Sequence, residues 1–279
     1  MQRGVTLVEL VVTIAVGSVV VAFMAMFIVT PISAYTAQAR RAELTDAADS
    51  VLRFMGRDLR SALPNSVRVT SGGSVTALEF LATLDGARYR DGGLPNDAMS
   101  LDFSTPDAAF ATTVPFTQLT LPWVSSSSYL VIYNVGVPGA NAYQMTNVIT
   151  PASTTINIAK DPASNQDLLT LNPAFQFSFV SPGKRMYLVS GPVSYLCDTA
   201  AGTLMRYSGY SIAATQPASA GALAGATAVS KVAGDVGSCQ FTFTPGTAQR
   251  NALSTLVLQL TQSGESVQLL HEVHLANSP

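Results

Sequence analysis

Charge is scarce in this chain of 279 residues. Only 11% of the residues are Asp, Glu, Lys or Arg, against about 25% in an average soluble domain, and the formal net charge is −2. Without a basic excess, the sequence does not support binding to nucleic acid or to anionic lipid. The surface must instead be covered by small and uncharged polar residues, a composition that suits an exported protein.

Residues for catalysis are equally few. The chain has two histidines and two cysteines, and it contains no Gly-x-Ser-x-Gly elbow, phosphate loop or dinucleotide-binding fingerprint. Nucleophilic catalysis needs an activated nucleophile beside a base, and the sequence offers no such pattern. We therefore predict that the protein is not an enzyme and uses no cofactor.

The two histidines belong to the run His271-Glu-Val-His274 near the C-terminus. This spacing suits neither a zinc site on a strand nor the His-Glu-x-x-His helix of metalloproteases. On an alternating strand, His271 falls on the apolar face and His274 on the other face. We predict a half-buried His271, an exposed His274 and no metal site.

An acidic, glycine-rich stretch could in principle hold calcium. It contains Asp85-Gly86, Asp91-Gly92-Gly93 and Asn96-Asp97. The stretch lacks the one-three-five carboxylate spacing and the closing glutamate of an EF-hand loop. Turns alone explain such Asp-Gly and Asn-Asp pairs, so we favour turns over a calcium site.

The two cysteines, Cys197 and Cys239, both lie in the half of the chain that we expect to be exported. An even count in an oxidising compartment indicates a disulfide, which would stabilise the fold by about 4 kcal/mol in the chain-entropy model. A zinc site would need clustered ligands. Residues 211–237 are rich in Ala, Ser, Gly and Thr, and we predict a mobile surface excursion inside the disulfide loop.

The longest apolar run begins just after Glu9. Residues 10–29 contain no charge, and as a helix they span about 30 Å, enough to cross the hydrocarbon core of a bilayer. A carboxylate near the end of such a segment costs up to about 2.5–3.5 kcal/mol, so Glu9 needs a partner. The alternative is that Glu9 only reaches the headgroups of an ordinary membrane anchor.

The helix is predicted to continue past the membrane, with a kink or local break at Pro31. Beyond it, apolar residues recur every three or four positions and share one face: Leu44, Ala48, Val51, Leu52, Met55, Leu59, Ala62 and Leu63. The opposite face carries Asp46, Asp49, Arg53, Arg57 and Arg60, and Pro64-Asn65 ends the helix. The second half of the helix should therefore pack on a soluble domain.

The sequence pattern predicts that this domain is β-rich. Together with the long N-terminal helix, this gives an α+β fold class. Candidate strands cover residues 66–70, 75–81, 129–135, 186–189, 204–210 and 239–243. Two C-terminal strands follow, in which Leu256, Leu258 and Leu260 alternate before a turn at Ser263-Gly264-Glu265. The return strand alternates from Val267 to Leu275.

The N-terminus resembles the class III signal of type IV pilins and pseudopilins. The residues that carry the likeness are Arg3-Gly4, then Val5 where Phe or Met is commoner, then Thr6-Leu7-Val8-Glu9. The resemblance implies cleavage by a prepilin peptidase between Gly4 and Val5 and N-methylation of Val5. It also supplies the partner of Glu9, the N-terminal ammonium of a neighbouring subunit, because two opposite charges satisfy each other where water cannot.

The resemblance also implies an organisation. Residues 1–4 form the leader, residues 5–63 a long helix whose assembly half covers about 5–32, and residues 64–279 a periplasmic or extracellular head. The chain would sit in the inner membrane with one span and then enter a pilus, with other major and minor pilins and the prepilin peptidase/methylase as partners and no nucleic acid.

Later segments are similar to large minor pilins of mannose-sensitive haemagglutinin (MSHA) pili. They cover residues 57–69, 187–189, 193–198, 204–210 and 265–274. This likeness implies a structural role in pilus assembly, in a tip or initiation complex. The alternatives are a J-type minor pseudopilin of a type II secretion system, a tip adhesin binding a surface ligand, and a plain membrane-anchored periplasmic protein.

Overall fold

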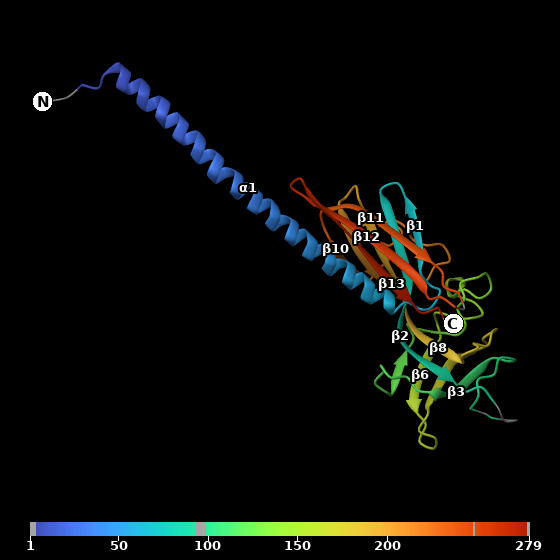
Figure 1. The fold of residues 1–279 in the computed structure, drawn as a ribbon. Coiled ribbons are helices and arrows are strands. Elements are labelled where there is room, and N and C mark those ends of the chain that lie inside the picture. Colours follow the sequence, from blue (N-terminus) through green and yellow to red (C-terminus); the bar gives the residue numbers. More distant parts are fainter. Residues whose placement is uncertain (1–3, 93–96, 98, 248, 278–279) are drawn as a thin grey trace.

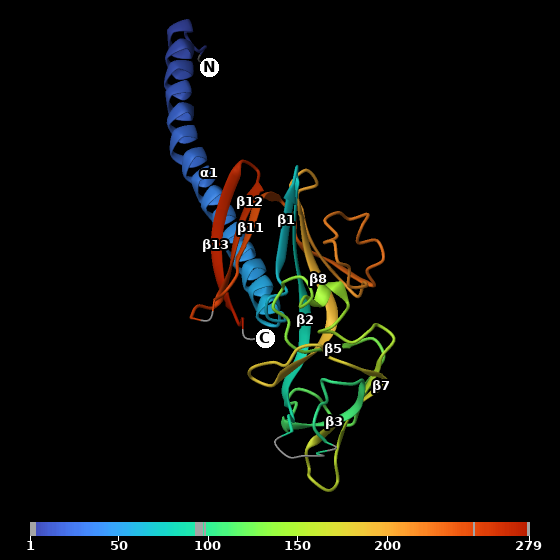
Figure 2. The ribbon, with the colours of Figure 1, turned by 90° about the vertical axis from the view of Figure 1, so that its right-hand side faces the viewer.

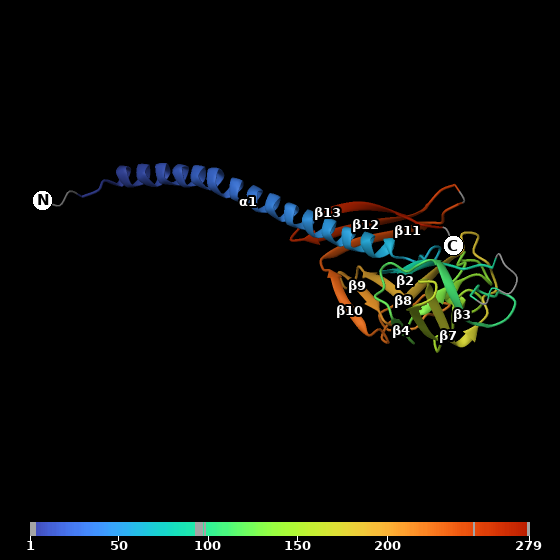
Figure 3. The same ribbon diagram turned by 90° about the horizontal axis from the view of Figure 1, so that it is seen from below.

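The computed structural model describes residues 4–92, 97, 99–247 and 249–277, and its first element is one long helix. Helix α1 (Leu7–Arg60) contains 54 residues and is therefore about 80 Å long. It projects as a stick from a β-rich head (Figure 1). The helix continues through position 31, so the chain does not break there, although the helix bends along its length (Figure 3).

The C-terminal part of the head is a three-stranded antiparallel sheet. Its order is β11 (Val236–Thr244), β12 (Ala252–Gln262) and β13 (Glu265–Leu275). Gln262 pairs with Glu265, so the β12–β13 hairpin has a two-residue loop, Ser263-Gly264, with φ of 50° and 84°. Two positive φ values are typical of a type I′ turn, which matches the twist of the strands. The predicted C-terminal hairpin is confirmed.

The other strands form a ten-stranded sheet in the order β10-β9-β8-β2-β3-β7-β6-β4, with β1 paired to β2 and β5 paired to β8. Their bounds are β1 (Arg68–Gly72), β2 (Val75–Tyr89), β3 (Asp107–Val114), β4 (Trp123–Ser125), β5 (Tyr129–Val131), β6 (Thr155–Lys160), β7 (Asp167–Phe175), β8 (Arg185–Asp198), β9 (Thr203–Ser208) and β10 (Ala228–Ala233). A 3-10 turn, η1, covers Ala142–Gln144. Figure 2 shows β3 and β7 at the end of the head farthest from the N-terminus.

The second half of α1 lies in the core between the two sheets (Figure 3). The predicted apolar stripe is confirmed: Ala62 is half-buried and the other seven members are buried. The stripe packs mainly on β12 and β13, and the same cluster includes Leu78 and Phe80 of β2 and Tyr195 of β8. On the opposite face, Asp46, Arg53, Arg57 and Arg60 are exposed and Asp49 is half-exposed.

Several strands differ from the sequence expectation. Strands β2 and β8 run well beyond the predicted segments, and β3, β4, β6 and β7 lie in the part of the chain where no strand was predicted. Residues 211–237 are not a free excursion: they contain β10, and Leu223 is only 1% exposed in a small apolar cluster with Tyr207. Short strands, rich in alanine or interrupted by proline, lack the alternation that would have revealed them.

Candidate processing and assembly site

The chain enters α1 through three exposed residues, Gly4, Val5 and Thr6, that lie outside regular secondary structure. A side chain at position 4 would meet no atom within 4 Å. Thr6 has extended backbone and is the N-cap, its hydroxyl accepting a hydrogen bond from the Glu9 N–H at 3.3 Å. The Gly4–Val5 bond is therefore accessible in this structure, whereas Arg3 lies outside the described residues.

Glu9 occupies the first turn of α1 and is exposed. The positive end of the helix dipole favours a carboxylate at this place. Within the described residues, the Glu9 carboxylate has no hydrogen-bond or ion-pair partner. In an apolar environment such a carboxylate needs a cation, and the residues that the structure describes place none beside it.

Apart from Glu9, the first part of α1 is apolar on every side. Leu7–Phe27 has a mean hydropathy of 2.6, and none of it is buried against the head. Its two hydroxyl groups are satisfied locally: Thr13 donates to the Leu10 carbonyl at 2.9 Å and Ser18 donates to the Ala15 carbonyl at 2.8 Å. Among the described residues, this is the one helical stretch with the length and composition to cross a bilayer.

At its other end, α1 is tied to the large sheet by Asp58. Its Oδ2 accepts hydrogen bonds from the Tyr195 hydroxyl and from Nε of Arg206, both at 2.7 Å. Burial, and then the neighbouring Asp58 carboxylate, raise the pKa of Tyr195, so the phenol stays protonated and continues to donate. The helix and strands β8 and β9 are thereby fixed to one another.

A second buried polar group lies where β1 and β2 pair. Nε of Arg68 donates to Glu79 Oε2 at 2.6 Å, and the Glu79 side chain is fully buried. The Tyr210 hydroxyl donates to the other carboxylate oxygen at 2.9 Å, and the Arg68 guanidinium lies 3.6 Å from the centre of the Tyr143 ring. Burial raises the pKa of Glu79, while Arg68 and Tyr210 oppose that rise.

A disulfide joins the two sheets. Cys197 of β8 and Cys239 of β11 are bonded, with their Cα atoms 6.6 Å apart. A surface ion pair from Arg41 of α1 to Glu265 adds a contact between the helix and the β12–β13 turn. The disulfide therefore links the two sheets of the head, and the ion pair links the head to α1.

The acidic residues that were considered as calcium ligands form ordinary hydrogen bonds and ion pairs within the head. Asp85 accepts backbone N–H groups of Thr117 and Gln118 at 2.7 and 2.6 Å, and Asp97 accepts from Arg90 at 2.7 Å. Asp91 lies 3.5 Å from the Lys184 ammonium. The structure describes no cluster of three or more potential metal ligands within its described ranges; Gly93 and Asn96 fall outside them.

The two histidines lie on opposite faces of β13. As predicted, His271 is half-buried and His274 is exposed. His271 faces α1 across a hollow that is also lined by Asp49, Arg53, Arg57 and Arg60. These side chains form a largely cationic surface and not a set of metal ligands.

The structure places Gly4, Val5 and Glu9 at the N-terminal end of α1, far from strands β8 and β11, which carry the two cysteines (Figure 1). Sequence reasoning missed Asp58 and the Arg68–Glu79 pair. A signal for Asp58 did exist, since it stands seven residues after Val51 and four before Ala62, at the spacing of the apolar stripe. A single carboxylate at such a position needs a buried partner.

One comparison with known families gives a match. The family described as "Prokaryotic N-terminal methylation motif" matches residues 1–25. Neither a curated protein nor a solved structure matches the chain. The motif is a prepilin signal, so it supports a type IV pilin-like or pseudopilin protein in general, a structural subunit anchored in a membrane and processed by a prepilin peptidase.

Proposed function

We propose that this protein is a minor pilin-like subunit of an MSHA-type type IV pilus. A prepilin peptidase cuts after Gly4, Val5 is N-methylated, and α1 then moves from the inner membrane into the pilus. There the subunit joins other major and minor pilins in a tip or initiation complex. The head faces the periplasm before assembly and the exterior afterwards.

The observation that carries the proposal is the free end of α1. An exposed Gly4–Val5 bond precedes a carboxylate that has no partner among the described residues, and an apolar segment follows that no described part of the head covers. A neighbouring chain that places its Val5 ammonium beside Glu9 satisfies both charges. Such a pair sets the axial register of parallel helices, which is the best-attested use of a buried ionic contact.

The assignment to MSHA pili rests on the segments 57–69, 187–189, 193–198, 204–210 and 265–274, which resemble the minor pilin MshO. These segments lie at the end of α1 and in strands β8, β9 and β13, all of which contribute residues to the largest apolar cluster described above. A J-type pseudopilin of a type II secretion system would share the stick and the β-rich head. The two candidates differ in their partners: loss of the chain would impair piliation in the first case and protein secretion in the second.

The first test is the N-terminal mass of the protein recovered from cells with and without an active prepilin peptidase. We expect a chain that begins at methylated Val5 and that is replaced by the full precursor when the peptidase is absent. An intact chain beginning at Met1 in both strains would overturn the proposal and leave a membrane-anchored protein.

The second test separates processing from assembly. The Glu9→Gln chain should still be cut after Gly4. Its amount in sheared pili should fall about tenfold, because the ion pair between Glu9 and the Val5 ammonium of a neighbouring subunit is lost. Glu43→Gln is the matched control, since Glu43 is an exposed carboxylate on the same helix. Equal recovery of both variants in pili would argue against the role of Glu9.

A further inference from the structure

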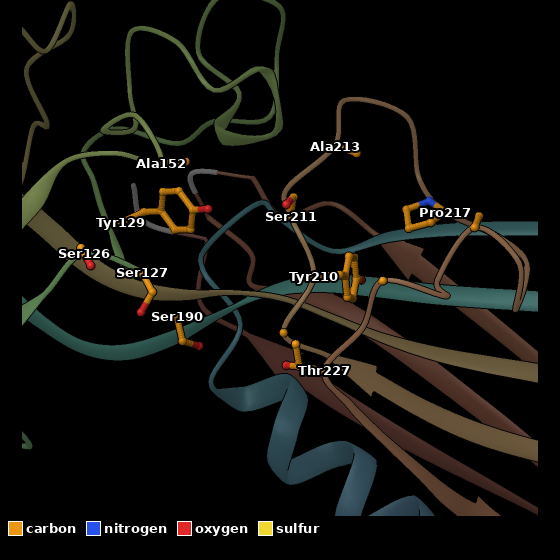
Figure 4. A pocket seen from close by; sticks show the side chains of 13 residues that line it. Ser126, Ser127, Tyr129, Ala152, Ser190, Tyr210, Ser211, Ala213, Pro217 and Thr227 are labelled. Carbon is orange, nitrogen blue, oxygen red and sulfur yellow. The ribbon is translucent and has the colours of Figure 1, made fainter.

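The head contains a hollow that the assembly role does not use. Its volume is about 780 Å³, and it lies between the loop before β5, the middle of β8 at Ser190 and the segment from Gly209 to Thr227. Tyr129 and Tyr210 stand on opposite sides of it, with Ser190 and Thr227 below and Ser211 between them (Figure 4). This volume lies within the range of about 300–1,000 Å³ that is usual for small-molecule sites.

The lining of this hollow is uncharged and rich in hydroxyl groups. Ser126, Ser127, Ser190, Ser211 and Thr227 contribute theirs, and no acidic or basic side chain lines the hollow. Within the described residues, the side-chain hydroxyls of Ser211 and Thr227 and the phenol of Tyr129 make no hydrogen bond. They remain available as donors and acceptors.

Tyr210, one of the two tyrosines that line the hollow, is fixed by hydrogen bonds. The Tyr210 hydroxyl donates to the buried Glu79 carboxylate at 2.9 Å and shares a second hydrogen bond with the Ser194 hydroxyl at 2.7 Å. These bonds fix the ring from its buried end. An aromatic face that is already ordered costs little conformational entropy when a ligand stacks on it.

The loop that closes the hollow is also tied down. Arg68 donates to the carbonyl oxygens of Ala213 and Ala214 at 2.8 and 2.7 Å. Gln216 donates to the Ala77 carbonyl at 3.1 Å, and Leu223 is buried beneath the loop. The wall is therefore a preformed surface, built partly on the half-buried Arg68, which is itself paired with the buried Glu79.

We propose that this hollow binds a neutral saccharide. The serine and threonine hydroxyls of the lining can donate to and accept from the hydroxyl groups of a sugar ring. The rings of Tyr129 and Tyr210 can pack against the apolar faces of that sugar. An anionic sugar would find no cation, and a purely apolar ligand would bury unpaired hydroxyls. The site is independent of filament assembly and gives the head a recognition role of its own.

The test uses the full chain in phosphatidylcholine nanodiscs, which avoids sugar-based detergents. Saturation-transfer NMR is run with methyl α-glucoside, methyl β-galactoside and N-acetylglucosamine, and with sialic acid as the anionic comparison. We expect at least one neutral sugar to bind with a Kd of about 1 mM, as is usual for a ligand of this size. Absence of binding by all neutral sugars, or stronger binding of sialic acid, would overturn the proposal.

Variants locate the site. Ala222→Trp places an indole at an exposed lining position and should weaken binding about tenfold, whereas Ala224→Trp, exposed on the same loop but outside the lining, should leave it unchanged. Tyr129→Phe keeps the ring and removes the hydroxyl, with an expected loss of about fivefold. Equal binding by the two tryptophan variants, with unchanged circular dichroism, would place the sugar elsewhere.

A glycan array identifies the source of the saccharide. A signal on immobilised neutral glycans that the free methyl glycoside competes away indicates recognition of the end of a surface glycan. Binding of the free glycoside without any array signal indicates a soluble sugar. Both results support the proposed site, and array binding restricted to sialylated or sulfated glycans contradicts it.

Discussion

A methyl group added to Gly56 of α1 would lie 2.8 Å from Nε2 of His271 on β13. Both residues are part of the contact between the helix and the three-stranded sheet, and Gly56 is buried. Glycine lowers the intrinsic stability of a helix, by about 1 kcal/mol relative to alanine. Its presence here is explained by the close approach of the imidazole.

This contact predicts opposite effects of one substitution in two backgrounds. Gly56→Ala should lower the free energy of unfolding by about 1 kcal/mol, because steric conflict exceeds the gain in helix propensity. In His271→Ser the same change should raise stability by about 1 kcal/mol, because the conflict is gone. Thermal unfolding of the four chains, followed by the near-ultraviolet signal of the head, measures the cycle. Additive effects would refute the contact.

Asp58 is expected to matter far more than other acidic residues of α1. Asp58→Ala removes the shared acceptor of Tyr195 and Arg206 and should cost about 2–3 kcal/mol. The control is Asp49→Ala, since Asp49 forms an exposed pair with Arg53 at 2.7 Å, and its loss should cost less than about 0.5 kcal/mol. Urea unfolding would compare them, and similar losses would count against a special role for Asp58.

The buried Glu79 makes the effect of losing Arg68 depend on pH. Because burial raises the folded-state pKa of Glu79, the native state favours the protonated carboxyl. Its contribution to stability is greatest below the unfolded pKa of about 4.3 and decreases as pH rises through the folded-state value. Arg68→Met removes the main opposing charge, so the pKa of Glu79 rises further and the decrease extends to higher pH.

The expected deficit of Arg68→Met is about 3–5 kcal/mol at pH 8, and it should shrink toward pH 5 as Glu79 becomes protonated. The control is the double variant Arg68→Met/Glu79→Gln. Because it lacks the Glu79 carboxyl, its loss of stability should not depend on the protonation of this site. Unfolding free energies between pH 5 and pH 8 provide the measurement. A deficit of Arg68→Met that stays constant across this range would rule out the mechanism.

Replacing both cysteines by serine should lower stability by about 2–5 kcal/mol. The disulfide connects β8 to β11, so hydrogen exchange should speed up most at the edge where the two sheets meet. Added reductant should destabilise the native chain and leave the double serine variant unaffected. No change in exchange at β11 would mean that packing alone holds the sheets together.

The elements that follow from the sequence are those with one apolar face and a regular period. The stripe from Leu44 to Leu59 and the alternation from Leu256 to Leu275 contact the same apolar cluster, so their patterns are clean, whereas Leu63 belongs to a second cluster. In β8 the run Ser190-Gly191-Pro192 reads as the end of a strand, yet pairing with β2 continues through it. A bulge beside these residues lets the strand continue, which local preference alone does not reveal.

The free end of α1 was also predictable, because a carboxylate beside an apolar run is conspicuous in the sequence itself. The polar contacts inside the head were not. Glu79 and Tyr210 are 131 positions apart, and Asp58 and Arg206 are 148 apart. Such pairs depend on sheet order, and the order of the ten strands is set by long-range pairing that no short pattern encodes.

The packing of the stripe against β12 and β13 has a consequence for the order in which the protein is made. The helix that needs covering is synthesised first, and the strands that cover it, Ala252–Gln262 and Glu265–Leu275, come last. Until these two strands have been made the stripe has no native sheet to cover it, so the nascent chain exposes apolar surface. If the head is exported as proposed above, a chaperone on the far side of the membrane would increase the fraction of chains that reach the folded state.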